Sequence, residues 1–288
     1  MRAVWTLRCL LVVGLCSAGL ADAADGQPRL TLLEGPAVLH LAERAVTARE
    51  GLRLAPGTLV DTTAQTTLLR IEWPDGTLLD LGPASRAMLQ PPASVGGGAA
   101  FYLLQGWAKF SRSGTPHGWS SPQLQGSPAK GVLVLAVAPG QTRAFAETGA
   151  QPLLERPGGR ARPVAAGELL SLNAGAQAEL SRRVPADWLT QLPRAFRDTL
   201  PSRLAAVTAV LATRGGEPPA DAAPAWRYEQ LQPWLSAEPA LRHDFPKRFA
   251  PRLAEPEFKA AVAAHLRQHP EWAPAIEPPK RPPNGEAR

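Results

Sequence analysis

The sequence has 288 residues and a formal net charge of +6, from 31 lysines and arginines against 25 aspartates and glutamates. Most of the excess lies after residue 180, where basic and acidic side chains alternate as they do on solvated helix faces. A nucleic-acid footprint would instead cluster lysine and arginine with few acids, so we expect no nucleic-acid partner.

Residues 1–23 predict a secretory signal peptide. Arginines precede an apolar run from about Leu10 to Leu20, small residues follow it, and cleavage is expected after Ala23. The run is shorter than the ~20 residues that a bilayer span needs, although a retained anchor and lipidation at Cys16 remain as alternatives. Both cysteines of the chain lie in this segment, so the mature protein would have no disulfide and no thiolate chemistry. We expect a periplasmic protein without a stable membrane span, and consider an extracellular or anchored form the weaker alternative.

Residues 24–180 form a succession of short apolar runs separated by Gly, Pro, Asp and Asn. Runs such as "TTLLRIEWPDG" and "AFYLLQGWAKFS" each carry about four to seven strand-like residues. Several alternate between apolar and polar residues, as Leu79, Asp80 and Leu81 do, and a helical period of useful length does not occur. The region predicts a mainly β N-terminal domain, a β-solenoid or sandwich of short strands joined by tight turns.

The stretch 71–89, "IEWPDGTLLDLGPASRAML", contains two acids and a serine, but we expect it to be structural. Pro-Asp-Gly at 74–76 lies between two strand-like runs, so Asp75 is expected to bond within its own hairpin turn. Asp80 lies in a predicted strand, and Ser85 follows Gly-Pro with no histidine nearby in the sequence.

Glycines support the same interpretation. Gly57 and Gly106 lie between apolar runs, where a bulge or a turn with positive φ is expected. Residues 94–100, "SVGGGAA", predict a flexible loop between strands.

The pattern changes to helical after residue 180. Residues 181–214 predict short helices that each begin near a proline, and residues 215–224 predict a linker. Residues 225–273 predict a small α-helical C-terminal region, in which 255–272 is the clearest longer helix. The Pro-rich residues 274–288 predict a disordered tail.

Large aromatic side chains are concentrated in this helical part. They are Trp188, Trp226, Tyr228, Trp234, Phe245, Phe249, Phe258 and Trp272. Short helices need large side chains to bury enough area, so a small helical core, or a cap packed on the open edge of the β domain, is the favoured interpretation. An exposed aromatic face that docks a partner is the alternative.

The β region resembles the FecR domain family. The residues that carry the resemblance are "LAPGTLVDTTAQTTLLRIEWPDGTLLDLGPASRAML" and the following "FYLLQGWAKF", within residues 49–110, with weaker likeness to about residue 178. The resemblance implies an exported, β-rich, solenoid-like module. In the signalling members such a module lies in the periplasm, is linked to a cytoplasmic anti-sigma segment, and relays a signal from a TonB-dependent receptor. We expect no such cytoplasmic segment here, and "SPAKGVLVLAV" does not match the Gly-Thr strand of many members.

Recognised catalytic constellations are missing from the sequence. It has no Gly-x-Ser-x-Gly elbow and no phosphate-binding glycine loop. His265 and His269 share a helical spacing that could hold a metal, but no Glu lies between them, and His243-Asp244 is only a sequence neighbour pair. We therefore predict no catalytic, cofactor-binding or metal-binding residues, and a protein that is not an enzyme. An unrecognised hydrolase that uses His243 or His265 is the least favoured alternative.

The predicted function is a non-catalytic scaffold or signalling-accessory module that binds another envelope protein. An exposed strand edge could add an extended segment of the partner, or a helical face could take a hydrophobic anchor. The alternative is binding of peptidoglycan or another glycan, in which Trp107 and Trp119 would stack on sugars.

Overall fold

The computed structural model describes residues 26–41, 44–90, 99–112, 117–126 and 129–276. The predicted signal peptide and both cysteines lie outside the described residues. So do residues 91–98, which hold most of the predicted glycine loop, and 277–288, which hold most of the predicted tail. Within the described ranges, helices are too short or too polar to cross a bilayer.

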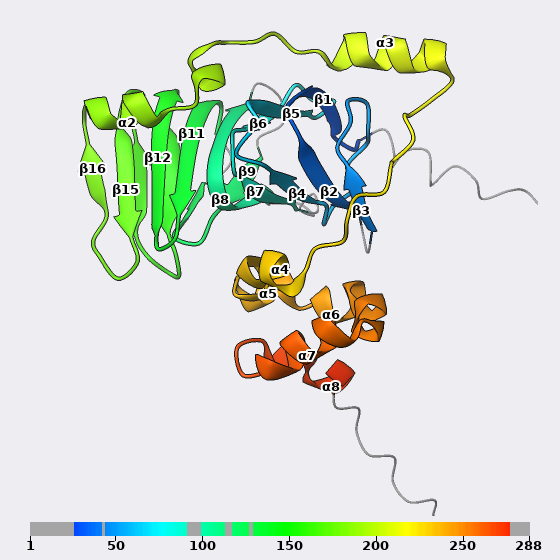
Figure 1. Ribbon diagram of the computed structural model, residues 1–288. Helices are drawn as coiled ribbons and strands as arrows, with labels where there is room; N and C mark the ends of the chain where they lie inside the picture. The colour runs from blue at the N-terminus through cyan, green and yellow to red at the C-terminus, as the bar shows by residue number, and fades with distance from the viewer. Residues whose placement is uncertain (1–25, 42–43, 91–98, 113–116, 127–128, 277–288) are drawn as a thin grey trace, which may run out of the picture.

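Two β-sheets make up the N-terminal part and confirm the predicted mainly β domain. The strands are β1 (Arg29–Glu34), β2 (Ala37–Leu41), β3 (Arg44–Thr47), β4 (Leu59–Thr62), β5 (Leu68–Glu72), β6 (Leu78–Leu81), β7 (Arg86–Leu89), β8 (Ala99–Arg112), β9 (Gly118–Ser120), β10 (Leu124–Gly126), β11 (Gly131–Ala138), β12 (Gln141–Thr148), β13 (Gln151–Glu155), β14 (Ala161–Val164), β15 (Leu169–Asn173) and β16 (Glu179–Ser181). One sheet, sheet A, has the order β1-β5-β6-β8-β11-β12-β15-β16. The other, sheet B, has the order β3-β2-β4-β7-β8-β9-β10-β13-β14. The long strand β8 belongs to both sheets, and of these pairings the one between β8 and β9 is parallel (Figure 1).

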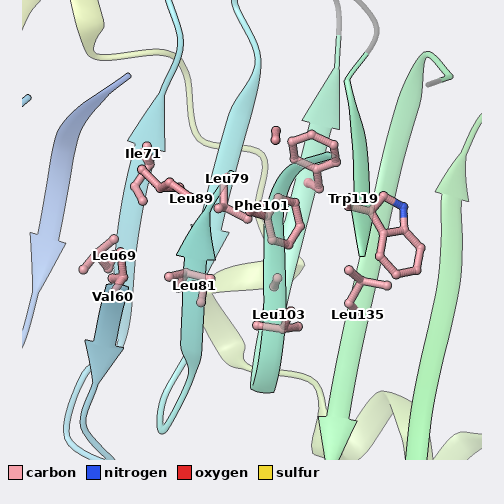
Figure 2. Close-up of a cluster of buried hydrophobic side chains, with 14 of the residues drawn as sticks. Val60, Leu69, Ile71, Leu79, Leu81, Leu89, Phe101, Leu103, Trp119 and Leu135 are labelled. Atoms are coloured by element: carbon pink, nitrogen blue, oxygen red, sulfur yellow. The ribbon is translucent and has the colours of Figure 1, made fainter. Parts of the chain in front are cut away.

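The main core lies between the two sheets. Figure 2 shows side chains of both sheets meeting there, with Leu69 of sheet A beside Val60 of sheet B and Ile71 of sheet A beside Leu89 of sheet B; Phe101 of sheet B lies farther along the same core. All five side chains are buried. Because side chains alternate along a strand, the residues between them point to the outer faces, so each sheet has a second surface to cover.

Gly106 marks the point where β8 passes from one sheet to the other. Its φ is +91°, and the pairing of β7 with β8 is irregular next to it, which confirms the predicted bulge. A Cβ atom at this position would lie 2.4 Å from the Cα of Ser85 and 2.7 Å from the carbonyl oxygen of Ala84. Only glycine therefore fits the crossing without moving the backbone of the neighbouring strand.

Gly106→Ala is expected to lower the free energy of unfolding by about 2–4 kcal/mol, because the positive φ and the backbone overlap both act. Gly57→Ala is the matched control: its φ is +81°, but nothing lies within 4 Å of the added Cβ, so only the backbone cost of about 1 kcal/mol remains. Urea denaturation of both variants measures the difference. Equal losses would show that the crossing is not tightly packed at Gly106.

Short helices cover both outer faces and confirm the predicted small helical region. The α-helices are α2 (Ala186–Gln191), α3 (Leu204–Arg214), α4 (Tyr228–Leu235), α5 (Pro239–Arg242), α6 (Phe245–Arg248), α7 (Pro256–Ala264) and α8 (Ala273–Ile276), and the 3₁₀ helices are η1 (Arg194–Arg197), η2 (Ala250–Ala254) and η3 (Pro270–Trp272). Trp188 of α2 and Phe196 of η1 pack on the outer face of sheet A, near Leu68 and Val134. The helical region from α4 onward lies beside the outer face of sheet B, with α4 and α5 nearer the strands than α7 and α8 (Figure 1), and its buried side chains form one cluster with residues of that face.

The segment 215–224, predicted as a linker, runs beside β3. The backbone N–H of Thr47 donates to the carbonyl oxygen of Asp221 at 2.9 Å, and that of Ala223 donates to the carbonyl oxygen of Ala45 at 2.9 Å. These bonds pair the outer edge of β3 with a second chain segment. The backbone N–H and C=O groups on this edge of sheet B are therefore not left open to another strand.

The helix predicted over 255–272 is shorter in the structure. Helix α7 ends at Ala264, and the chain then turns before η3 begins at Pro270. The apolar period extends past the true end because Leu266 also packs on the helical core from a non-helical turn. The disordered tail was predicted to begin at residue 274, but helix α8 extends to Ile276.

Candidate binding surfaces

Asp75 is a turn residue, as predicted. Its carboxylate accepts a hydrogen bond from the Thr77 backbone N–H at 2.9 Å, and the Gly76 N–H donates to the Trp73 carbonyl oxygen at 3.0 Å. The structure adds a partner that the sequence did not reveal, because His117 Nε2 lies 3.0 Å from the second carboxylate oxygen. Burial acts to raise the pKa of Asp75, but the bonds from Thr77 and the nearby His117 outweigh burial and lower it.

Asp80 is the centre of a row of charged side chains on the outer face of sheet A. Arg70, Asp80 and Lys109 lie directly opposite one another on β5, β6 and β8. Arg70 binds the Asp80 carboxylate with two hydrogen bonds, Nε–Oδ1 at 2.6 Å and Nη2–Oδ2 at 2.7 Å. Lys109 Nζ lies 3.0 Å from a carboxylate oxygen of Glu147 on β12. Burial alone would lower the pKa of Arg70, but the bonds and the charge of Asp80 outweigh burial and raise it.

A chain segment crosses over this row and is bound by it. Arg70 Nη1 donates to the carbonyl oxygens of Leu200 and Pro201 at 3.1 and 3.0 Å, and Lys109 Nζ donates to the carbonyl oxygen of Phe196 at 2.7 Å. In all three of these bonds the charged side chain of the sheet binds a backbone carbonyl oxygen of the segment. We call residues 198–203 the strap.

A polar cavity of about 440 Å³ lies between the strap and sheet A. Its lining includes Lys109, Ser111, Glu147 and Thr148 from the sheet and Asp198 and Thr199 from the strap. Charged and hydroxyl groups on the sheet side suit hydrogen bonding to a polar chain or ligand.

The histidines singled out in the sequence lie in the helical region. His265 Nδ1 is 2.8 Å from the Ala261 carbonyl oxygen, and the His265 and His269 ring centres are 6.5 Å apart. His243 and Asp244 are both exposed, with a side-chain distance of 3.2 Å. Among the described residues, no group of three or more His, Cys, Asp or Glu side chains is placed to share a metal ion.

The aromatic side chains of the helical part are buried, which confirms the interpretation as a core. All eight have low exposure, and those from Trp226 onward pack with Leu59, Met88 and Tyr102 on the outer face of sheet B. The two tryptophans considered for sugar stacking are covered as well. Trp119 is 1% exposed between the sheets, and the half-buried Trp107 packs on Trp188 with ring centres 5.0 Å apart.

His40 lies where the helical region docks on sheet B. It is 2% exposed, and its ring centre is 3.4 Å from that of Trp226. Arg248 closes the same contact by donating to the carbonyl oxygens of His40 and Gly57, both at 2.7 Å. Burial, with the nearby charge of Arg248, Arg252 and Arg86, lowers the pKa of His40 to about 3.

Strand β16 leaves an open edge at one end of sheet A. It pairs with β15, and within the described ranges its other side has no strand partner (Figure 1). Leu180 in the middle of β16 is 41% exposed, and the exposed Arg182 and Arg183 follow the strand. At the opposite end of sheet A, backbone bonds from residues 51–54 cover β1. The surface at β16 therefore combines free pairing groups, an apolar side chain and positive charge.

Comparisons with known proteins give a partial likeness to solved structures. No protein-family model and no curated protein matches the chain. Two crystal structures, at 2.50 and 1.65 Å, of a candidate anti-sigma factor from Parabacteroides distasonis are similar to it at 13% and 12% identity. Each match has a TM-score of 0.38 and covers 46% of this chain and 62% of the other, so less than two thirds of that chain is spanned.

Proposed function

We propose that this protein is an exported, non-catalytic FecR-like module of the cell envelope that binds another protein in the periplasm, as a scaffold or signalling accessory. The single observation that supports this most is the open edge of β16. A strand with unpaired N–H and C=O groups accepts an extended segment of a partner by main-chain hydrogen bonds. Leu180 would supply an apolar contact, and Arg182 and Arg183 would favour a partner segment with acidic residues.

The two sheets differ in how their edges are protected, and this is why β16 is preferred over other strands. The outer edges of β1 and β3 are covered by segments of the chain itself. The terminal strand of sheet B, β14, contains Pro163. Proline has no backbone N–H to donate, so this edge is less suited to pairing with a strand of another protein. Strand β16 has no proline and carries the exposed Leu180.

Site-specific photocrosslinking in intact cells tests the proposal. A photoreactive amino acid at position 180 is expected to crosslink one envelope protein, whereas the same amino acid at Ala206, an exposed position on the distant helix α3, is expected not to (Figure 1). In a second form of the experiment the probe is placed at Glu179, and Leu180→Asp is expected to abolish the crosslink because it puts a charge into an apolar contact.

Two outcomes would reject this docking site. Crosslinking of equal strength from positions 180 and 206 would indicate random encounter. Absence of a crosslink together with recovery of the protein in the purified cell-wall pellet would favour the alternative, peptidoglycan or glycan binding.

A further inference from the structure

The chain between β16 and α3 is held on sheet A in two different ways. Its first part is anchored by apolar burial, because Trp188 and Phe196 are almost fully buried against the sheet. Its second part, the strap, is mostly exposed, and only Leu200 and Arg203 are half-buried. The two parts therefore differ in what they would expose if they lifted from the sheet.

Polar contacts fasten residues 200–203 of the strap to charged groups of β5. Arg70 donates to the Leu200 and Pro201 carbonyl oxygens, as described above. Glu72 accepts from the Ser202 hydroxyl and from the Arg203 backbone N–H, the latter at 2.9 Å. These are contacts to a peptide backbone and one small hydroxyl, so they would recognise an extended segment of another chain as well as they recognise the strap.

Opening the strap would expose a charged surface. Arg70 and Glu72 would each regain water in place of the strap groups that they bind, which offsets much of the lost hydrogen bonding. Segments with few buried apolar contacts are the ones that open locally while the rest of a protein stays folded. The polar cavity beneath Asp198 and Thr199 shows that the strap does not fill the space that it covers.

We infer that the outer face of sheet A at Arg70 and Glu72 is a second peptide-binding site, and that the strap occupies it as an internal substitute for an extended polypeptide ligand. This inference rests on the proposed role in protein binding, but its site is separate from the edge of β16. A partner segment that presents backbone carbonyls to Arg70 and an N–H or hydroxyl to Glu72 displaces the strap. The strap thereby lowers the apparent affinity for that partner.

The test supplies the strap sequence as a separate peptide. In the full chain, residues 198–202 are replaced by Gly-Ser-Gly-Ser-Gly, and a fluorescent, end-capped peptide of residues 197–203 is titrated by anisotropy. The strap-replaced protein is expected to bind the peptide at least tenfold more tightly than the unmodified protein. The Gly-Ser segment loses more conformational freedom on docking, and it lacks the Leu200 side chain and the Ser202 hydroxyl, so it occupies the site for less of the time. Adding Glu72→Gln is expected to weaken this binding several-fold, whereas Glu155→Gln, which changes a residue paired with Arg162 on sheet B, is expected to leave it unchanged.

Equal affinity of the two proteins, or equal binding of a scrambled peptide, would overturn the inference. If the strap-replaced protein does not fold, hydrogen exchange of the unmodified protein decides instead. Excess peptide is then expected to accelerate exchange at the Arg203 amide, which Glu72 protects, and unchanged exchange would count against displacement. The titration uses only purified components, so its result does not depend on the crosslinking experiment in cells. If the peptide binds but position 180 gives no crosslink, the site at Arg70 and Glu72 is supported and the edge of β16 is rejected as a docking site.

Discussion

Arg70→Met is expected to lower the free energy of unfolding by about 3–5 kcal/mol, because it leaves the Asp80 carboxylate buried without its hydrogen-bonded partner. Arg70 and Asp80 are both almost fully buried, and the pair is joined by two hydrogen bonds. The same substitution also removes the bonds to the Leu200 and Pro201 carbonyl oxygens. Urea denaturation followed by circular dichroism measures the loss.

The double variant Arg70→Met/Asp80→Leu separates the buried charge from the packing. If the unpaired carboxylate causes most of the loss, the double variant is expected to recover more than half of it, because an apolar pair of similar size needs no counter-charge. Glu147→Gln serves as a control, since Glu147 is partly exposed and its pairing with Lys109 is worth little, about 1 kcal/mol or less. A double variant no more stable than Arg70→Met would mean that the strap bonds, not the charge, dominate.

The parts of the fold that local patterns control could be predicted from the sequence. Alternation across residues 68–81 indicates two strands, and Pro-Asp-Gly between them fixes a hairpin, so the placement of Asp75 followed directly. Gly57 and Gly106 both have positive φ, as expected from their positions between apolar runs. The concentration of aromatic residues after residue 180 also predicted a small helical core, which in the structure includes residues of the outer face of sheet B.

The candidate sites depend on contacts between distant residues, and local patterns do not contain these. Asp80 has the sequence of an outward-facing strand residue, which normally meets water. Its partner Arg70 also binds the strap, 130 residues away in the sequence. No turn or period encodes a contact over that separation. His117 reaches Asp75 in the same way, across 42 residues. Helix α7 was predicted too long because apolar spacing continues through a turn whose side chains are also buried.

A loss of stability in mild acid is the second large effect, and it comes from His40. An unfolded chain takes up a proton at His40 near the ordinary pKa of 6.5, whereas the folded protein does so only near pH 3. Between these values the unfolded state binds more protons, so the stability contributed by the neutral His40 is present above pH 6.5 and is lost as the pH falls toward 3. The difference amounts to about 2 kcal/mol between pH 8 and pH 5.

His40→Gln is expected to remove this part of the pH dependence, although glutamine packs less well on Trp226 and lowers stability at every pH. The measurement is the free energy of unfolding in urea at pH 5 and pH 8 for the unmodified protein, His40→Gln and His243→Gln. His243 is exposed and serves as the matched control, so its variant should keep the full loss in acid. Because His40 and Trp226 join sheet B to the helical region, fluorescence of the helical tryptophans should report the same transition. If His40→Gln lost as much stability between pH 8 and pH 5 as the unmodified protein, the acid sensitivity would belong to another group, and His40 would be an ordinary packing residue.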